Sequence, residues 1–163
     1  MQSEGEGKTM DLILWRHAEA HPAREGQDDL DRRLTAHGER QARRMALWLE
    51  QKLPATTQVM VSPAERCQAT ARALEDRALR TLDALAPDRG IVGLLAAVQW
   101  PDAHAPVLVV GHQPTLGRVA AHLLIGLDAA WSVKKAGVWW LRSRRREGVL
   151  QTVLHGVMVP ELL

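Results

Sequence analysis

Short strand-like runs that alternate with helical patterns constrain the fold of this chain more than any other feature. Four runs have the length of strands inside a sheet, and they lie at residues 11–15, 58–61, 81–85 and 106–110. The last of them is Pro followed by Val and Leu only, which is typical of a strand that is covered on both faces. The pattern predicts a buried sheet whose strands are joined by longer connections.

Helical patterns fill those connections. From Thr35 onward, apolar residues recur with the i, i+3, i+4, i+7 spacing of one helix face, at Ala42, Met45, Ala46 and Leu49. A second helix is predicted to begin at Pro63, because Pro is tolerated in the first turn of a helix. Its expected apolar stripe consists of Cys67, Ala71, Leu74 and Ala78. Two further helices are predicted at residues 91–99 and 115–124.

Strands that alternate with helices favour βαβ units with right-handed crossovers and helices on both faces of the sheet. We therefore expect an α/β fold, a three-layer α/β/α sandwich with a mostly parallel sheet. Two last strands, at residues 137–141 and 148–155, are expected to flank a basic turn and to form an antiparallel edge. Residues 1–9 are expected to be a disordered or tag-like segment, and residues 10–163 a single domain.

Composition and charge narrow the classes of protein. Hydrophobic residues make up 46% of the chain and charged residues 25%, as in soluble globular domains. No apolar run approaches the roughly 18 residues of a membrane span, and the first nine residues contain no secretory signal. The single cysteine, Cys67, excludes an internal disulfide and a thiolate-rich metal site. We expect a cytoplasmic protein that does not act at a membrane.

Basic and imidazole side chains follow three of the predicted strands. Arg16 and His17 end the first strand, Ser62 ends the second with Arg66 one turn into the next helix, and His112 ends the fourth. Because the carboxyl ends of parallel strands meet at one edge of a sheet, we expect these side chains to converge on one ligand crevice. Ser62 is expected to support substrate binding indirectly, by contacting the side chains that touch the substrate.

Two arginines and two histidines at one edge suit a phosphoryl group. Arg16, Arg66 and His112 could hold its oxygens and leave His17 to attack phosphorus in line. Neighbouring positive charges favour the neutral imidazole that a nucleophile needs. Because the side chains themselves supply the compensating charge, we expect no metal and no other cofactor.

Four motifs occur in order along the chain. They are LWRHAEA (residues 14–20), LTAHG (34–38), SPAERCQATA (62–71) and VVGHQP (109–114), with a weaker continuation at KAGV (135–138). Together they resemble the histidine phosphatase superfamily, and its small SixA-type phosphohistidine phosphatase branch in particular. The resemblance implies a phosphoglycerate mutase-like fold in residues 10–163. It also implies His17 as the phosphate-accepting nucleophile, with Arg16, Arg66 and His112 as the other catalytic residues of the phosphate pocket.

The sequence departs from the family pattern at the proton donor. Larger members place a Glu or Asp after the third strand, and the aligned residue here is Ala84. Three carboxylates remain as candidate acids, namely Glu19, Asp83 and Asp88. An alkoxide leaving group needs such a donor, whereas the imidazole of a phosphohistidine can be protonated before its P–N bond breaks. The missing acid therefore favours an N-phosphoryl substrate.

These observations lead to one expected function and two alternatives. We expect a phosphatase that acts through a phosphohistidine intermediate and removes phosphate from phosphohistidine on a partner protein. The first alternative is a phosphatase of small phosphorylated metabolites on the same scaffold. The second, of another class, is a noncatalytic module that binds a phosphorylated ligand or RNA.

Other conspicuous residues carry weaker signals. The Gly7-Lys8-Thr9 triplet resembles the end of a P-loop but lacks its first Gly and its preceding strand. The basic run at 142–146 is more typical of a solvated hairpin turn than of a nucleic-acid surface, so a nucleic-acid partner is not expected. The loop at 18–34 could fold over the crevice, with Asp29, Arg32 and Arg33 facing either the substrate or solvent.

Overall fold

The computed structural model describes residues 7–163, so the first six residues of the expected tag-like segment lie outside the described part of the chain. Six strands form one sheet in the order β3-β2-β4-β1-β5-β6. They are β1 (Met10–Arg16), β2 (Gln58–Val61), β3 (Leu79–Thr81), β4 (Val107–Gly111), β5 (Val138–Arg146) and β6 (Val149–Met158). The first four in that order are parallel, and β5 and β6 add an antiparallel edge. The expected α/β class and antiparallel edge are confirmed.

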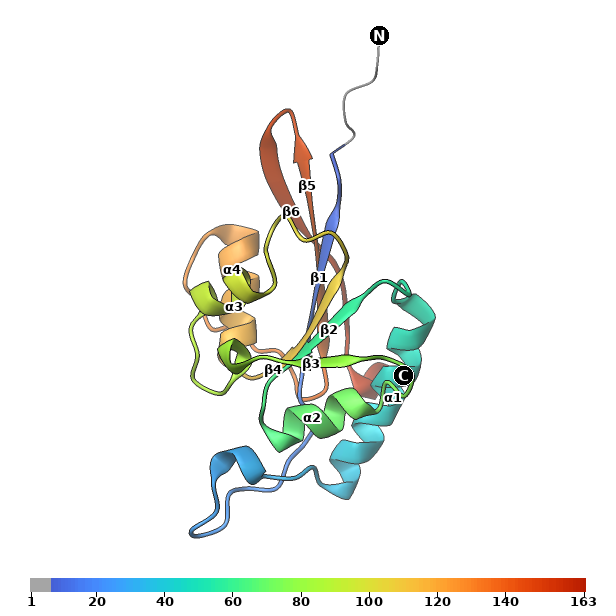
Figure 1. The fold of residues 1–163 in the computed structure, drawn as a ribbon, viewed down its shortest axis with the longest axis vertical. Helices are drawn as coiled ribbons and strands as arrows, with labels where there is room; N and C mark the ends of the chain where they lie inside the picture. The colour runs from blue at the N-terminus through green and yellow to red at the C-terminus, as the bar shows by residue number, and fades with distance from the viewer. Residues whose placement is uncertain (1–6) are drawn as a thin grey trace.

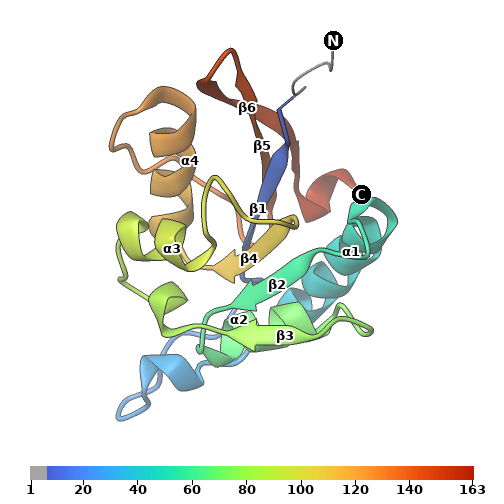
Figure 2. The ribbon, with the colours of Figure 1, turned by 45° about the horizontal axis from the view of Figure 1, so that its top comes forward.

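Helices cover both faces of this sheet (Figure 1; Figure 2). They are α1 (Ala36–Lys52), α2 (Glu65–Arg72), α3 (Ile91–Ala97) and α4 (Thr115–Ile125). Three short 3-10 turns accompany them, η1 (Asp29–Asp31), η2 (Asp83–Leu85) and η3 (Pro160–Leu162). The pair α1 and α2 lies on one side of the sheet and the pair α3 and α4 on the other (Figure 2).

The alternation of side chains along each strand supplies two hydrophobic cores. In β1, Ile13 and Trp15 join the core beneath α1 and α2, while Leu12 and Leu14 join the core beneath α3 and α4. All four side chains are fully buried. Burying one such aliphatic side chain contributes about 1.5–3 kcal/mol, so both faces hold β1 in the centre of the molecule. This fixes the carboxyl end of β1, which carries the candidate nucleophile.

Helix α1 begins where the sequence predicts. The Thr35 hydroxyl caps the helix by accepting a hydrogen bond from the Gly38 N–H at 2.9 Å. The predicted apolar face is buried, as Ala42, Met45, Ala46 and Leu49 show. A Cβ on Gly38 would lie 2.0 Å from the Glu19 carbonyl oxygen, so only glycine lets the helix approach the strand-end loop this closely.

Two predictions around β3 are wrong. The third strand covers Leu79–Thr81 rather than residues 81–85, and Asp83–Leu85 form the turn η2. The second helix begins at Glu65 and ends at Arg72, so its stripe stops early and Ala78 is exposed. The error in the strand has a physical cause, because β3 is a largely exposed strand of three residues at the edge of the sheet, paired with β2. The sequence of β3 therefore carries no alternation that marks its ends.

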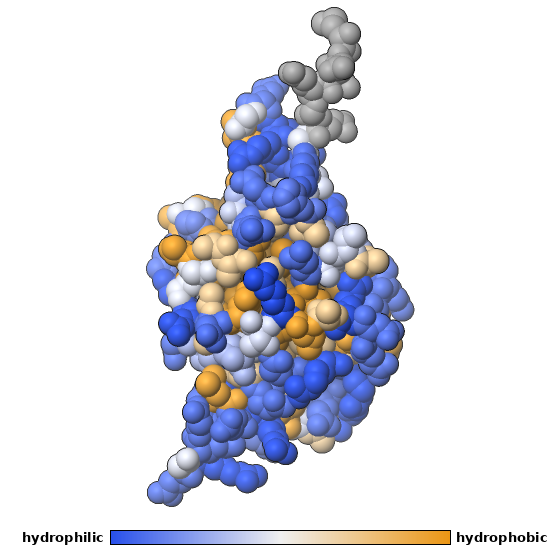
Figure 3. All heavy atoms as spheres, viewed as in Figure 1, coloured by the Kyte–Doolittle hydropathy of each residue, from blue (hydrophilic) through white to orange (hydrophobic). Residues whose placement is uncertain are grey.

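The predicted position of the basic run, in a turn between the last two strands, is also wrong. Arg142 to Arg146 belong to β5, and the turn is formed by Glu147 and Gly148, which both have positive φ. Arg144, Arg145 and Arg146 are exposed because pairing of β5 with β1 ends at Ser143, so this end of the strand pairs with β6 alone. The β5–β6 hairpin projects from one end of the molecule and the loop around η1 from the other (Figure 1), and this loop is hydrophilic (Figure 3).

Between residues 7 and 163, no helix has the length and apolar character needed to cross a lipid bilayer.

Candidate active site

Three strand ends bring the predicted side chains to one cavity. His17 and Ser62 extend the parallel ladder beyond β1 and β2, because the His17 N–H donates to the Gly111 carbonyl and the Ser62 N–H to the Val110 carbonyl, both at 3.1 Å. Arg66 lies in the first turn of α2, and His112 follows β4. A cavity of about 320 Å³ forms at this edge. Its lining residues are Arg16, His17, Ala20, Asp29, Arg32, Arg66, Pro87, Asp88, His112, Gln113 and Lys135.

The ring of His17 is buried and held in one tautomer. Its Nδ1 lies 2.7 Å from the carbonyl oxygen of Ala18, and a carbonyl can only accept, so Nδ1 carries the hydrogen. In the neutral ring, Nε2 is then the unprotonated nitrogen. Burial, and then the charges of Arg66 and Arg16, lower the pKa of His17 from 6.5 to about 4, although the Ala18 hydrogen bond opposes the shift. His17 is therefore a neutral imidazole at physiological pH.

His112 faces His17 across the cavity, with ring centroids 5.3 Å apart. Its Nε2 lies 2.7 Å from the Ser62 hydroxyl oxygen, and its Nδ1 lies 3.4 Å from Nη2 of Arg66. Because a guanidinium can only donate, this contact assigns the hydrogen to Nε2, which donates to Ser62. Burial, and then the neighbouring His17 and Arg66, lower the pKa of His112 to about 3. Ser62 thus orients the second imidazole.

The Cys67 thiol packs behind the same ring. Its Sγ lies 3.4 Å from Nε2 of His112, and the side chain is fully buried. Burial raises the pKa of the Cys67 thiol to about 12, so it remains protonated and unreactive. Cys67 serves as a small packing residue against His112, in keeping with its place in the predicted apolar stripe of the second helix.

Arg66 is buried and reaches across the cavity to the loop of η1. Its Nη1 donates to the Asp29 carbonyl oxygen at 2.7 Å, and its Nη2 donates to Oδ2 of the Asp29 carboxylate at 2.9 Å. Arg32 also binds this carboxylate, with 3.2 Å between Nη1 and Oδ1. The loop at 18–34 therefore does fold against the crevice, and Asp29 and Arg32 line it, whereas Arg33 lines a separate hollow with His21.

The cavity carries an excess of positive charge. Four cationic side chains line it, those of Arg16, Arg32, Arg66 and Lys135, against the carboxylates of Asp29 and Asp88. Arg16 is fixed by a 2.9 Å hydrogen bond from Nη1 to the Val133 carbonyl. Within residues 7–163, the buried Nε atoms of Arg16 and Arg66 have no hydrogen-bond partner. Buried N–H donors of this kind need an acceptor, and an anion would supply one.

The Thr70 hydroxyl links the strand end that carries His17 to the helix that carries Arg66. Oγ1 of Thr70 accepts a hydrogen bond from the Ala18 N–H at 3.0 Å and donates to the Arg66 carbonyl at 2.7 Å. Thr70 is fully buried in α2. The Thr70 side chain therefore links the backbone next to His17 to the backbone of Arg66, and this link holds the two residues in place relative to each other.

Comparison with known proteins decides the family. A sequence model of the histidine phosphatase superfamily (branch 1) matches residues 12–87. An uncharacterized protein of Picosynechococcus is 34% identical over 142 residues, covering 82% of this chain and 86% of that protein. The phosphohistidine phosphatase SixA of Escherichia coli K12 is 31% identical over 124 residues, covering 72% of this chain and 76% of that protein. The chain belongs to the histidine phosphatase superfamily.

Structural comparison agrees with this membership. The phosphohistidine phosphatase SixA from Nakamurella multipartitia superimposes with a TM-score of 0.75 and 29% sequence identity, covering 94% of this chain and 97% of that one. The fold is the phosphoglycerate mutase-like fold of SixA structures, as the motifs predict. Membership of the histidine phosphatase superfamily makes the chain a phosphatase, and therefore a hydrolase.

The three carboxylates predicted as acids of this histidine phosphatase occupy different places. Glu19 accepts a hydrogen bond from the Thr35 hydroxyl at 2.9 Å and does not line the cavity, and Asp83 lies outside it at the start of η2. Asp88 does line the cavity and is exposed, on a backbone with a φ of 65°. Among the three, only Asp88 is placed to meet a substrate.

Four cavity residues of this histidine phosphatase are not identified as site residues by the sequence alone. Gln113 and Lys135 lie within the motifs VVGHQP and KAGV, but nothing in those motifs assigns them a role. For Asp29 and Arg32, which the sequence leaves facing either the substrate or solvent, the charge density of the loop at 18–34 is the only signal. Which of those charges face the crevice depends on how η1 folds, and no periodicity in the sequence encodes that.

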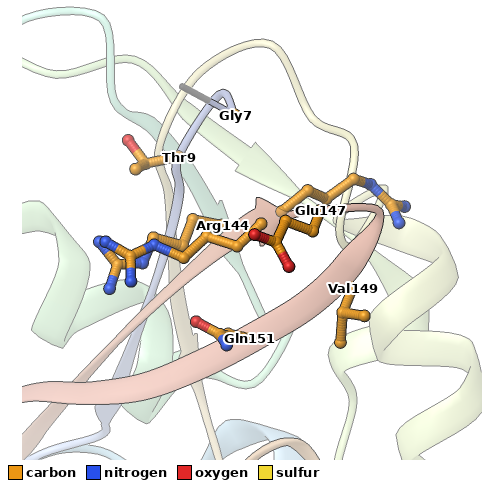
Figure 4. A pocket seen from close by; sticks show the side chains of 8 residues that line it. Gly7, Thr9, Arg144, Glu147, Val149 and Gln151 are labelled. Atoms are coloured by element: carbon orange, nitrogen blue, oxygen red, sulfur yellow. The ribbon is translucent and has the colours of Figure 1, made fainter. Parts of the chain in front are cut away.

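The basic run lies away from this cavity. Arg144 and its neighbours extend beyond the amino end of β1, about 20 Å from the site for a strand of this length. There they line a hollow of about 700 Å³ with Gly7, Thr9, Glu147, Val149 and Gln151 (Figure 4). Arg142 is held by Asp11 through two hydrogen bonds of 2.7 and 2.8 Å. The run therefore contributes nothing to the candidate active site.

Proposed function

We propose that this protein is a metal-independent phosphatase in which His17 accepts the phosphoryl group from a phosphohistidine side chain of another protein. The observation that carries the proposal is the state of His17, a neutral imidazole held by the Ala18 carbonyl in a cationic cavity. A neutral ring among arginines is a nucleophile suited to an anionic electrophile. We propose a cytoplasmic location and a single domain over residues 10–163 as part of the same hypothesis.

The proposed reaction has two steps, transfer of the phosphoryl group to His17 and its hydrolysis. The substrate phosphohistidine first takes up a proton from solvent on its unphosphorylated ring nitrogen. Nε2 of His17 then attacks phosphorus and forms a P–N bond, while the P–N bond to the substrate imidazole breaks and its electron pair returns to the substrate nitrogen, so that a neutral imidazole leaves. Water then attacks the phosphorylated His17, which releases inorganic phosphate and restores the free imidazole. Throughout, the ring stays oriented by its Nδ1–H hydrogen bond to Ala18.

The surrounding side chains stabilise the transferred phosphoryl group. Arg16 and Arg66 are both anchored, and within residues 7–163 both retain an unpaired buried Nε–H, so their guanidinium groups are held in place to bind its oxygens. A bound dianion favours protonation of nearby imidazoles, which would let His112 donate a hydrogen bond as well. These cationic groups supply the charge compensation that a metal would otherwise provide.

The choice of substrate rests on the leaving group. Glu19 and Asp83 lie outside the cavity, and a substrate imidazole needs less help from a protein acid than an alkoxide does. The Escherichia coli relative carries the name phosphohistidine phosphatase SixA, which supports the same substrate class. The second candidate function, a phosphatase of small phosphoesters, is favoured by one observation, the position of Asp88 at the cavity.

Turnover of three substrates, with and without EDTA, tests the proposal. We expect fast hydrolysis of a phosphohistidine protein, slow hydrolysis of a sugar phosphate, and intermediate or better hydrolysis of para-nitrophenyl phosphate, whose leaving group needs little protonation. EDTA should change none of the rates. Preference for the sugar phosphate would favour the second candidate, binding without turnover would favour a noncatalytic module, and a requirement for added Mg²⁺ or Zn²⁺ would refute the cationic mechanism.

A further inference from the structure

The turn η1 presents an ordered carboxylate to the cavity. The Asp28 side chain caps this turn by accepting a hydrogen bond from the Leu30 N–H at 2.9 Å. At the base of the loop, the His21 N–H donates to the Arg33 carbonyl at 2.9 Å. These contacts fix the direction in which Asp29 leaves the turn, so its approach to Arg66 is built into the loop.

Asp29 accepts a hydrogen bond from each terminal nitrogen of Arg66. Nη1 donates to the Asp29 carbonyl, and Nη2 donates to its carboxylate and lies 3.4 Å from Nδ1 of His112. A phosphoryl group that binds both terminal nitrogens would compete with Asp29 for them. The other carboxylate oxygen is held by Arg32. Two guanidinium groups thus bind the two oxygens of one carboxylate, and arginines bind the oxygens of a phosphate in the same way.

The partners differ in their freedom to move. The Arg66 side chain is 5% exposed and fixed in the cavity wall, whereas the Asp29 side chain is 50% exposed. Burial alone would raise the pKa of Asp29, but the hydrogen bonds from Arg66 and Arg32 outweigh it and lower the pKa. Asp29 is therefore an anion at neutral pH that can turn toward solvent while Arg66 stays in place.

We propose that Asp29 determines the anion selectivity of the site. This inference rests on the proposed phosphoryl-binding role of Arg66, and it holds that an anion must displace this carboxylate to bind both terminal nitrogens of Arg66. A monoanion that does so exchanges one negative charge for another and gains little. A phosphoryl dianion brings a second charge and also reaches Arg16 and His112, so it alone displaces Asp29 effectively.

Anion binding by the full chain tests the proposal without turnover. Calorimetric titrations with inorganic phosphate and with acetate would compare the wild type, Asp29→Asn, Asp29→Ala and the matched control Asp31→Asn. Asp31 lies in the same turn, is exposed and does not line the cavity. We expect the two Asp29 variants to bind phosphate about tenfold more tightly, as loss of one charge-assisted competitor predicts, and to acquire measurable acetate binding. The control should behave as the wild type does.

The contrary results are distinct. Unchanged or weaker phosphate binding in both Asp29 variants, with thermal unfolding unaltered, would overturn the inference and make Asp29 a positioning residue for Arg66. Equal gains in Asp31→Asn would overturn it as well, because the effect would then follow net charge alone. Failure of the wild type and of every variant to bind phosphate would instead refute the proposed function on which the inference rests.

Discussion

The imidazole of His17 should stay neutral at pH values far below those at which an ordinary histidine becomes protonated. With a pKa near 4 rather than 6.5, the ring is about 90% neutral at pH 5, whereas an ordinary histidine is only about 3% neutral there. Burial is the largest cause, and the charges of Arg66 and Arg16 add to it. Heteronuclear NMR of the buried His17 imidazole over pH 3.5–8 measures this titration directly. The His17 signal is assigned by its absence in a His17→Gln variant.

The same chain in concentrated urea provides the control, because the unfolded ring should titrate near its ordinary pKa of about 6.5. A folded-state midpoint at that value would refute the reasoning from burial and neighbouring charge. It would also remove the observation on which the proposed mechanism depends, since the ring would then be largely protonated in mildly acidic solution.

The depressed pKa also makes stability depend on pH, with a definite sign. Near pH 5.5 the unfolded chain binds a proton at His17 that the folded chain does not, so acid favours unfolding. The contribution is fully present above pH 6.5 and is lost as the pH falls toward 4, by about 3 kcal/mol for His17. His112 acts in the same direction. Urea unfolding should therefore weaken across this window, and the His17→Gln variant should show a flatter dependence.

Substitutions at the site separate the remaining roles. We expect His17→Ala to abolish the phosphoenzyme and His112→Ala to leave weak phosphorylation that can be trapped on His17; label found on His112 instead would reverse the two assignments. Removing each candidate acid should lower kcat on phosphohistidine less than about tenfold in steady-state assays, well short of the 10² to 10⁴ typical of a true general acid. The variants are Asp83→Asn, Asp88→Asn and Glu19→Gln. A loss above a hundredfold in a folded variant would identify the general acid and favour phosphoester substrates.

Much of the site could be predicted because parallel strands fix where their ends go. Once residues 11–15, 58–61 and 106–110 are recognised as strands, Arg16, His17 and His112 have to meet at one edge. The first turn of the following helix places Arg66 beside them. These inferences need only the direction of each strand, which apolar runs reveal well.

The parts that could not be predicted depend on contacts between distant segments. The capture of Arg66 by Asp29 joins residues 37 positions apart through a loop without periodicity. The run from Arg142 to Arg146 reads as a turn because arginines suit solvent, yet pairing with β1 and β6 makes it a strand. In both cases tertiary partners, rather than local preference, decide the conformation.

The buried Thr70 hydroxyl has a consequence for how the molecule tolerates motion. This hydroxyl binds the Ala18 N–H, next to His17, and the Arg66 carbonyl at the same time. We therefore expect a displacement of α2 to move His17 and Arg66 in the same direction. The distance between His17 and Arg66 should therefore change little when the helix layer shifts against the sheet.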